Sequence, residues 1–273
     1  MRRPGRKAAL LALAVIVLSC AALWVWLRFD VLLRPVVVLR GADAAALLRP
    51  SLAARVVDRV GRPVSADSRP RLIALSFDDG PYPVETPLLL QTLRDLGVPA
   101  TFFLIGRDAE QFPDLTRAIA AGGNEIADHT LTHPNLDQLG DRAVQAELQA
   151  GAAALERIAP DPAERRLFRP PHGRFTLATI RAAQAAGYDT ILWSDDPGDW
   201  RSIGAAEIRD HVLRRARAPE ILLLHSGRQA TIAALPQIVG RFRRAGYAFV
   251  TVGALLRRTS AEQLNRPARL PLE

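Results

Sequence analysis

From residue 71 onward, short apolar segments alternate with helical segments, and this alternation restricts the fold more than any other feature of the chain. Leu89, Leu93 and Leu96 show the helical spacing, and Gly97 marks the end of that helix. Seven segments have the pattern of strands, at residues 71–77, 100–105, 124–127, 167–169, 190–194, 220–224 and 248–252. Strands separated by helices predict an α/β fold with a parallel sheet, either open or closed into a barrel.

Titratable residues gather where the predicted strands end. In parallel α/β folds, sites lie at the carboxyl ends of the strands. Five of the seven strands are followed by such residues, namely Asp78 and Asp79, His129 and His133, Arg169 and His172, the group Asp195, Asp196 and Asp199, and His225. No glycine-rich phosphate loop follows the first strand, so a dinucleotide site lacks its fingerprint. The sequence therefore predicts one polar site at this end of the sheet.

His129 and His133 are four residues apart. On a helical turn, this spacing places both imidazoles on one face, within reach of a single metal ion. With one carboxylate they form a set that suits catalytic zinc, or non-haem iron in an oxygenase. A hydrolase also needs a general base and a general acid, and the second aspartate of the Asp78–Asp79 pair and His225 can supply them. An iron oxygenase has no obvious need for either group.

Five segments together resemble the ordered motifs of the polysaccharide deacetylases, which form carbohydrate esterase family four and carry the chitooligosaccharide deacetylase homology domain. They are Ser-Phe-Asp-Asp-Gly-Pro at 76–81, His-Thr-Leu-Thr-His-Pro at 129–134, Phe-Arg-Pro-Pro-His-Gly at 168–173, Asp-Pro-Gly-Asp-Trp at 196–200 and Leu-Leu-Leu-His-Ser at 222–226. The resemblance covers roughly residues 70–256. It implies a distorted (β/α)7 barrel, in agreement with the seven predicted strands.

The resemblance also implies a reaction, the hydrolysis of N-acetyl groups to acetate and a free amino sugar. Asp79, His129 and His133 would hold a divalent metal, with zinc as the expected ion and cobalt or nickel as alternatives. Asp78 would be the general base for the attacking water, and His225 would protonate the leaving amine. A backbone N–H between residues 169 and 173 would help the metal to hold the oxyanion.

Further residues receive supporting roles from the same resemblance. Asp199 would orient His225 and raise its pKa, since a nearby carboxylate favours the imidazolium. Arg169 would pair with Asp78 and fix its position.

Three residues are expected to contact substrate. Strand alternation puts Leu223 on the same face as His225, and Leu223 and Trp200 would then enclose the acetyl methyl group. His172 stands where the family often has tyrosine, and we expect its backbone to donate and its side chain to touch sugar. Ser226 stands where aspartate is frequent, and we expect this difference to have little effect.

Other polar and aromatic residues are expected to have no role in the chemistry. Trp193 and Phe102 have the pattern of core residues, and Asp196 that of a turn residue. His211 lies in the middle of a predicted helix, among Arg and Asp, and we expect it to face solvent.

Residues 1–30 are predicted to form a membrane anchor. Residues 8–27 carry no charge and, at about 1.5 Å per residue, reach about 30 Å, the thickness of a bilayer core. The basic residues before them predict a cytoplasmic N-terminus. The catalytic domain would then lie outside the cytoplasm, on a single-pass protein of the plasma or inner membrane. A cleaved signal peptide and secretion form the alternative, although the apolar run is longer than usual for a signal.

The rest of the chain is predicted to comprise a connector at 31–70, a catalytic domain at 71–257 and a C-terminal tail at 258–273. Cys20 is the only cysteine, which excludes an intramolecular disulfide and a cysteine-based metal cluster. The net charge of +8 is scattered along the chain, and no basic stripe alternates with aromatic residues. We therefore expect no nucleic-acid partner. Separately, we expect the protein to be a monomer.

The function expected from this sequence is N-deacetylation of N-acetylglucosamine units in an envelope or extracellular polysaccharide. Peptidoglycan, chitin-like polymers and poly-N-acetylglucosamine all offer such units. One alternative is an O-acetyl esterase that acts on xylan-like glycans with the same site. The other is a carbohydrate-binding barrel without catalytic activity.

Overall fold

A curved parallel sheet forms the centre of the structure, a computed structural model that describes residues 38–39, 71–160, 166–258 and 268–269. Its parallel strands run in the order β6-β5-β4-β3-β2-β8. Their bounds are Leu72–Asp78 (β2), Thr101–Leu104 (β3), Glu125–Asp128 (β4), Arg166–Phe168 (β5), Tyr188–Ile191 (β6) and Glu220–His225 (β8). The expected α/β class with a parallel sheet is confirmed.

Short strands extend this sheet at two places, and two others form a small separate sheet. Strand β9 (Ala248–Phe249) pairs in parallel with the start of β2. Strand β1 (Val38–Leu39), from the expected connector, pairs antiparallel with β6. Strand β10 (Ala268–Arg269), from the expected tail, pairs antiparallel with β7 (Arg217–Ala218) in a separate two-stranded sheet.

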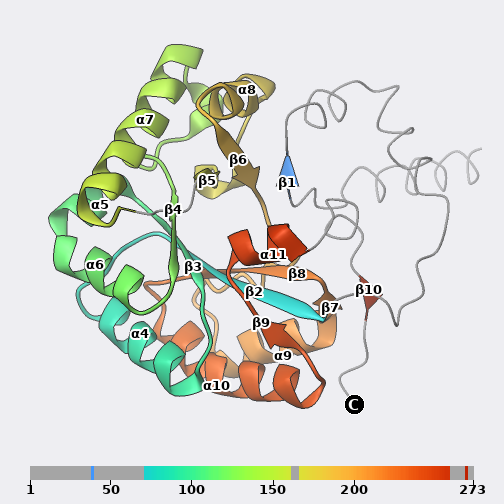
Figure 1. Ribbon diagram of the computed structural model, residues 1–273. Coiled ribbons are helices and arrows are strands. Elements are labelled where there is room, and N and C mark those ends of the chain that lie inside the picture. Colours follow the sequence, from blue (N-terminus) through green and yellow to red (C-terminus); the bar gives the residue numbers. More distant parts are fainter. Residues whose placement is uncertain (1–37, 40–70, 161–165, 259–267, 270–273) are drawn as a thin grey trace, which may run out of the picture. The chain divides into compact units, whose positions relative to one another are not determined.

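Helices surround the strands, as Figure 1 shows. They are Glu85–Leu96 (α4), Gly106–Gln111 (α5), Pro113–Ala121 (α6), Asp141–Ile158 (α7), Leu177–Ala185 (α8), Ala205–Arg215 (α9), Gln229–Arg244 (α10) and Val252–Arg258 (α11), with 3-10 turns at Leu136–Gln138 and Pro171–Gly173. Helix α4 ends as expected at Gly97, which adopts the left-handed conformation with φ 59°. It begins at Glu85, before the expected cap at Thr86, and the Thr86 hydroxyl in the first turn accepts the N–H of Tyr82 at 2.7 Å.

The described core contains three apolar clusters, and strand alternation places two of them on opposite faces of the sheet. One contains outward-facing strand residues such as Phe77 and Phe102 and lies against α4, α9 and α10. The other contains residues of the opposite face, such as Ala74 and Phe103, together with side chains of α11, and Trp193 packs against it. On the same face as this second cluster, β2 ends at Asp78 and β8 at His225, while His129 and Arg169 directly follow β4 and β5. The period of two along each strand therefore aims the site residues at one another.

The sheet does not close as the seven-stranded barrel that was expected. Strands β6 and β8 do not pair along their length, and only an isolated parallel bridge joins Asp195, after β6, to Leu222 in β8. The N–H of Leu223 donates to the Asp195 carbonyl there at 3.0 Å. The fold is thus a parallel half-barrel whose two edges touch at one point.

A side chain explains why the predicted strand at 190–194 ends at Ile191. Arg169 donates from Nε to the Ile191 carbonyl at 3.4 Å and from Nη2 to the Leu192 carbonyl at 3.2 Å. These carbonyls are the groups that a strand would use to continue its ladder. The guanidinium therefore takes the place of a neighbouring strand.

The expected membrane anchor at 8–27 lies outside the described residues, as do most of the connector and the tail. Within the ranges that the structure describes, no helix is both long enough and apolar enough to cross a bilayer.

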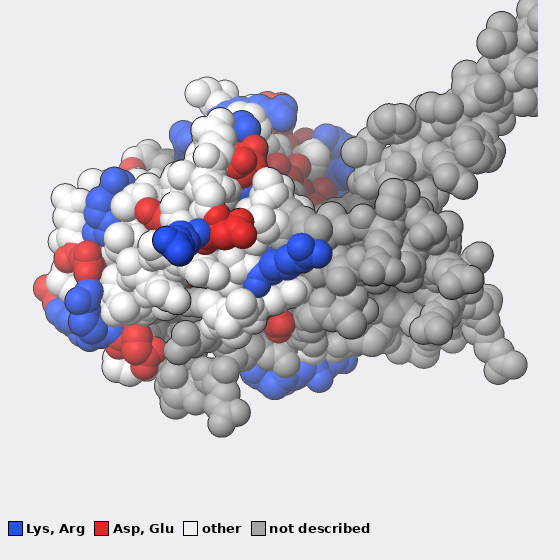
Figure 2. All heavy atoms as spheres, turned by 90° about the horizontal axis from the view of Figure 1, so that it is seen from above, with Lys and Arg blue, Asp and Glu red and all other residues white. Residues whose placement is uncertain are grey.

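Charged side chains of both signs are mixed on the face seen in Figure 2. Basic and acidic groups lie beside one another there, with uncharged surface between them. This face agrees with the expectation of a scattered charge.

Helix α7 passes close to the loop that carries His129, and Gly151 makes this approach possible. A Cβ at position 151 would lie 2.6 Å from Asp128 Oδ1 and 2.9 Å from the carbonyl carbon of Thr130. Both distances are too short for real contacts, so a side chain there must displace the loop.

We predict that Gly151→Ala lowers the free energy of unfolding by about 1–3 kcal/mol, because it overpacks this crossing. The matched control is Gly240→Ala in α10, where the new Cβ would lie 3.5 Å from the nearest atom, Arg244 Nη1. Alanine at such a helix interior should stabilise the protein by about 0.5–1 kcal/mol. Urea unfolding measures both changes, and a shift of the same sign in the two variants would contradict this account.

Candidate active site

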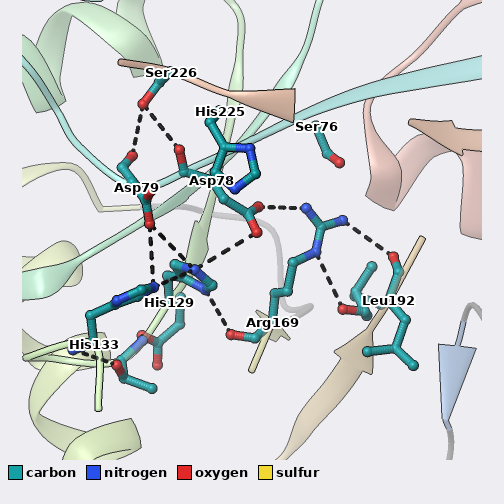
Figure 3. A network of polar contacts seen from close by, with 12 residues as sticks. Ser76, Asp78, Asp79, His129, His133, Arg169, Leu192, His225 and Ser226 are labelled. Atoms are coloured by element: carbon teal, nitrogen blue, oxygen red, sulfur yellow. Dashed lines mark hydrogen bonds and ion pairs between the residues drawn. The ribbon is translucent and has the colours of Figure 1, made fainter. Parts of the chain in front are cut away.

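Side chains from four strands converge at the carboxyl end of the sheet (Figure 3). Asp78 ends β2 and Asp79 follows it, while His129, Arg169 and His225 lie at the ends of β4, β5 and β8. These are the positions that the sequence places at strand ends, and the structure brings them together.

Asp79, His129 and His133 present three ligand atoms that all lie within 4.8 Å of one another. His133 Nε2 lies 3.3 Å from Asp79 Oδ1, and His129 Nε2 lies 3.7 Å from the same oxygen. The two Nε2 atoms are 3.2 Å apart. Two imidazole nitrogens and one carboxylate oxygen form a donor set that fits a divalent cation and leaves coordination positions free.

The protonation states of these residues agree with metal binding. His129 Nδ1 lies 2.8 Å from the Arg169 carbonyl, which can only accept, so Nδ1 carries a hydrogen and Nε2 is the nitrogen that faces the other two ligand atoms. Burial, with the charges of His129 and His172, lowers the pKa of His133 to about 3, which keeps its imidazole neutral. Burial raises the pKa of Asp79, and a cation would favour its ionised form.

The expectation that His129 and His133 share a helical turn is wrong. Thr130 and His133 both have positive φ, 72° and 61°, which a helix does not allow. The Asp128 carboxylate accepts the N–H of Thr130 at 2.8 Å, and the Thr130 hydroxyl accepts the N–H of His133 at 3.0 Å. Side-chain hydrogen bonds therefore fold the segment into a tight loop, and this loop brings the two rings together.

Asp78 forms a buried ion pair with Arg169, as the resemblance implied. Arg169 Nη1 lies 2.5 Å from Asp78 Oδ1, and Arg169 is fully buried. The guanidinium also lies over the Phe103 ring, 3.9 Å from its centroid. The other carboxylate oxygen, Oδ2, is 3.7 Å from His129 Nε2 and so faces the three ligand atoms.

His225 and Asp199 form a dyad beside these residues. His225 Nδ1 lies 2.7 Å from Asp199 Oδ1, and the His225 N–H donates to Oδ2 at 2.9 Å. The Thr231 hydroxyl also donates to Oδ2, at 2.6 Å. Burial acts to lower the pKa of His225, but the hydrogen bond and charge of Asp199, with the charges of Asp78 and Asp79, outweigh it and raise that pKa. Nε2 is the ring nitrogen left to exchange a proton.

The three expected substrate contacts differ in their surroundings. Leu223 is buried on the face of β8 that carries His225. Trp200 is 48% exposed, with the Arg201 guanidinium 4.7 Å from its ring centroid, so it is not a core residue. The ring of His172 lies edge-on to that of the ligand candidate His133, with centroids 4.5 Å apart.

Sequence reasoning assigned some neighbouring residues wrongly and missed others. His211 does not simply face solvent, because its Nε2 lies 3.2 Å from the buried carboxylate of Asp195. Asp196 accepts the N–H of Gly198 at 2.7 Å, as a turn residue does. Thr231 comes from a helix, and no motif marked it. Ser226, at which the sequence predicted little effect, is buried against the Asp78–Asp79 turn.

We predict that Arg169→Gln lowers the free energy of unfolding by about 3–5 kcal/mol, because it leaves the buried Asp78 carboxylate without its cation. Arg174→Gln is the matched control, since Arg174 pairs with Asp137 at the surface. The control should cost far less, because exposed ion pairs are screened by water. Chemical denaturation at neutral pH measures both, and equal losses would argue against a structural role for the buried pair.

Comparison with known proteins gives relatives along the same part of the chain. A family model described as polysaccharide deacetylase matches residues 65–191. A peptidoglycan-N-acetylglucosamine deacetylase of Bacillus cereus is 39% identical over 192 residues, which cover 68% of this chain and 89% of that protein. A chitooligosaccharide deacetylase of Sinorhizobium fredii is 36% identical over 188 residues, which cover 64% of this chain and 87% of that protein.

The fold has close counterparts among solved structures. One is a mutant of BA3943 from Bacillus anthracis, described as a family-four carbohydrate esterase pseudoenzyme with restored enzymatic activity. It superposes with a TM-score of 0.65 at 27% identity and covers 68% of both chains. Because a pseudoenzyme shares this fold, activity must be argued from the site residues. The first relative is similar over nearly its whole length, and the chain therefore belongs to the polysaccharide deacetylase family.

Proposed function

We propose that this protein is a metal-dependent N-deacetylase that hydrolyses the acetamide of N-acetylglucosamine units in a polysaccharide. One observation carries the proposal: the adjacent carboxylates Asp78 and Asp79 have different partners. Asp79 faces His129 and His133, whereas Asp78 is paired with Arg169. A hydrolase needs this division, because one carboxylate must bind the cation while the other remains free to accept a proton.

Asp79, His129 and His133 are the residues that would hold the cation. A divalent cation bound there supplies a Lewis acid for the acetamide carbonyl and for the attacking water. We propose zinc, because two imidazoles and one carboxylate with open positions suit catalytic zinc, and cobalt or nickel would suit the same donors.

Asp78 acts as the general base. Its pairing with Arg169 fixes the position of the carboxylate. Oδ1 is engaged with Arg169, so Oδ2, which faces the three ligand atoms, accepts the proton of the attacking water. An N–H of the 169–173 loop would then help to stabilise the oxyanion.

His225 acts as the general acid. Asp199 holds its Nδ1, so the proton given to the leaving amine comes from Nε2. The raised pKa of His225 keeps this proton in place until the carbon–nitrogen bond breaks. Transfer of the proton releases a neutral amino sugar, and acetate is the other product.

Substrate contacts complete the proposal. Leu223 lies two residues before His225 on the same face, and with Trp200 it would enclose the acetyl methyl group. His172 would touch a neighbouring sugar. The named activities of the two relatives support peptidoglycan or a chitin-like polymer as the substrate, with poly-N-acetylglucosamine as a third option.

We further propose that residues 8–27 hold the protein in the plasma or inner membrane, with the catalytic domain outside the cytoplasm. The length of this uncharged segment and the basic residues before it support the proposal. Secretion after cleavage is the alternative, and we expect the protein to act as a monomer.

We predict that the zinc-loaded protein releases acetate from N-acetylglucosamine oligomers and that chelation abolishes this release. Asp78→Asn should reduce the rate by about 10²–10⁴-fold, because the variant lacks the general base. Enzymatic assay of acetate, with mass spectrometry of the products on peptidoglycan, chitin oligomers and acetylated xylan, measures the activity. Release from xylan alone would establish the O-acetyl esterase. Binding without turnover on every polymer would favour a carbohydrate-binding barrel.

We predict that Asp199→Asn moves the alkaline limb of the pH–rate profile to lower pH. Asp199 raises the pKa of His225, and His225 must be protonated to act, so its removal causes the acid form to be lost earlier as pH rises. The acidic limb, set by Asp78, should stay in place. Thr231→Val is the control, because it removes one hydrogen bond to Asp199 and keeps the charge. An alkaline limb that does not move in Asp199→Asn would exclude the assigned role.

A further inference from the structure

The hydroxyl of Ser226 contacts the backbone of the turn that carries both site carboxylates (Figure 3). Its Oγ lies 3.1 Å from the carbonyl oxygen of Asp78 and 3.0 Å from that of Asp79. Ser226 is 1% exposed, so water has little access to these groups. Its own N–H donates to the Asp78 carbonyl at 3.1 Å. The backbone N–H of Ser226 already donates to the Asp78 carbonyl. The single hydrogen of the Ser226 hydroxyl can therefore donate to the Asp79 carbonyl.

The turn that Ser226 contacts has an unusual backbone. Asp79 has φ 70° and Gly80 has φ 74°, so two consecutive residues are left-handed. Glycine adopts this conformation freely, but for aspartate it is uncommon and must be held by its surroundings. The direction of the Asp79 carboxylate depends on this φ. Gly80 also lacks room for a side chain, because a Cβ there would lie 2.9 Å from Ser226 Oγ.

We propose that Ser226 is a positioning residue for the metal site. Its hydroxyl holds Asp79 in the left-handed conformation, and this conformation directs the carboxylate toward His129 and His133. This inference rests on the metal role given to Asp79 in the proposed function. It differs from the expectation that serine at this position has little effect.

Strand β2 provides a matched control. The Ser76 hydroxyl is also buried and donates to a carbonyl of β8, that of Leu222, at 2.8 Å. Ser76→Ala and Ser226→Ala therefore each remove one buried hydroxyl that donates to a backbone carbonyl, the first between β2 and β8 and the second between the residues that end or directly follow these strands. Ser76 lies within the regular part of the strand, whereas Ser226 bonds to the metal-binding turn. Comparison of the two variants separates the loss of stability that follows from any lost buried hydrogen bond from a change in zinc binding at the site.

The test measures zinc affinity of the full-length protein by competition with a chromophoric chelator, independently of activity. Ser226→Ala should weaken zinc binding by about 10–100-fold, the usual effect of losing a residue that orients a metal ligand. Ser76→Ala should leave zinc affinity unchanged. With EDTA present, both variants should melt about 2–4 °C lower than the wild type, because each has lost one buried hydrogen bond.

A second variant keeps the test valid if Ser226→Ala folds poorly. Ser226→Cys has nearly the same shape but a weak donor, so its zinc affinity should fall between those of the wild type and Ser226→Ala. Unchanged affinity in Ser226→Cys and Ser226→Ala, with zinc binding intact in the wild type, overturns the role of Ser226 and leaves the proposed function standing. Equal losses in Ser226→Ala and Ser76→Ala also overturn it. A wild-type protein that binds no zinc, cobalt or nickel contradicts both proposals.

Discussion

The buried ion pair between Asp78 and Arg169 is the interaction on which the rest of the site depends. Arg169 is completely buried, and its guanidinium is shared by a carboxylate, an aromatic ring and two backbone carbonyls. Burying two charges gains little stability and often costs some, so packing alone does not explain this arrangement. The ion pair instead fixes the geometry of the site. The guanidinium connects the end of β2 to the residues that end β5 and β6, and it holds Oδ1 of Asp78 while Oδ2 faces His129 Nε2.

The environment gives chemically identical side chains different roles. His133 and His225 both lie near the carboxyl end of the sheet, but burial with the neighbouring imidazoles lowers the pKa of His133, whereas Asp199 raises the pKa of His225. A neutral imidazole can bind a cation, and an imidazolium can donate a proton. The two aspartates differ in the same way, because Asp78 contacts a fixed positive charge and Asp79 contacts two ring nitrogens. In the proposed mechanism, a general base, a general acid and a ligand set therefore arise from only two residue types.

Much of the fold and the site could be predicted because strands impose simple rules. Side chains alternate with a period of two, and parallel strands end at the same edge, so residues after separate strands meet even when they are far apart in the chain. Asp78, His129, Arg169 and His225 follow these rules. The chain also carries all five motif segments in order, and this pattern in the sequence alone resembles the family to which the chain belongs. The N-terminal segment falls outside the described residues, so its role still rests on length and hydrophobicity.

The backbone conformation of the loops and the side-chain contacts between distant residues could not be predicted from strand periodicity. The spacing of His129 and His133 suits a helix, yet positive φ values and hydrogen bonds from Asp128 and Thr130 make a loop. The sequence alone determined which strand ends carry the reactive residues, because periodicity is local. Only the tertiary structure decided that β6 and β8 do not pair to close the sheet into a barrel, and that the Ser226 hydroxyl contacts the backbone of the Asp79 turn. These features depend on contacts between residues distant in sequence, to which no local spacing corresponds.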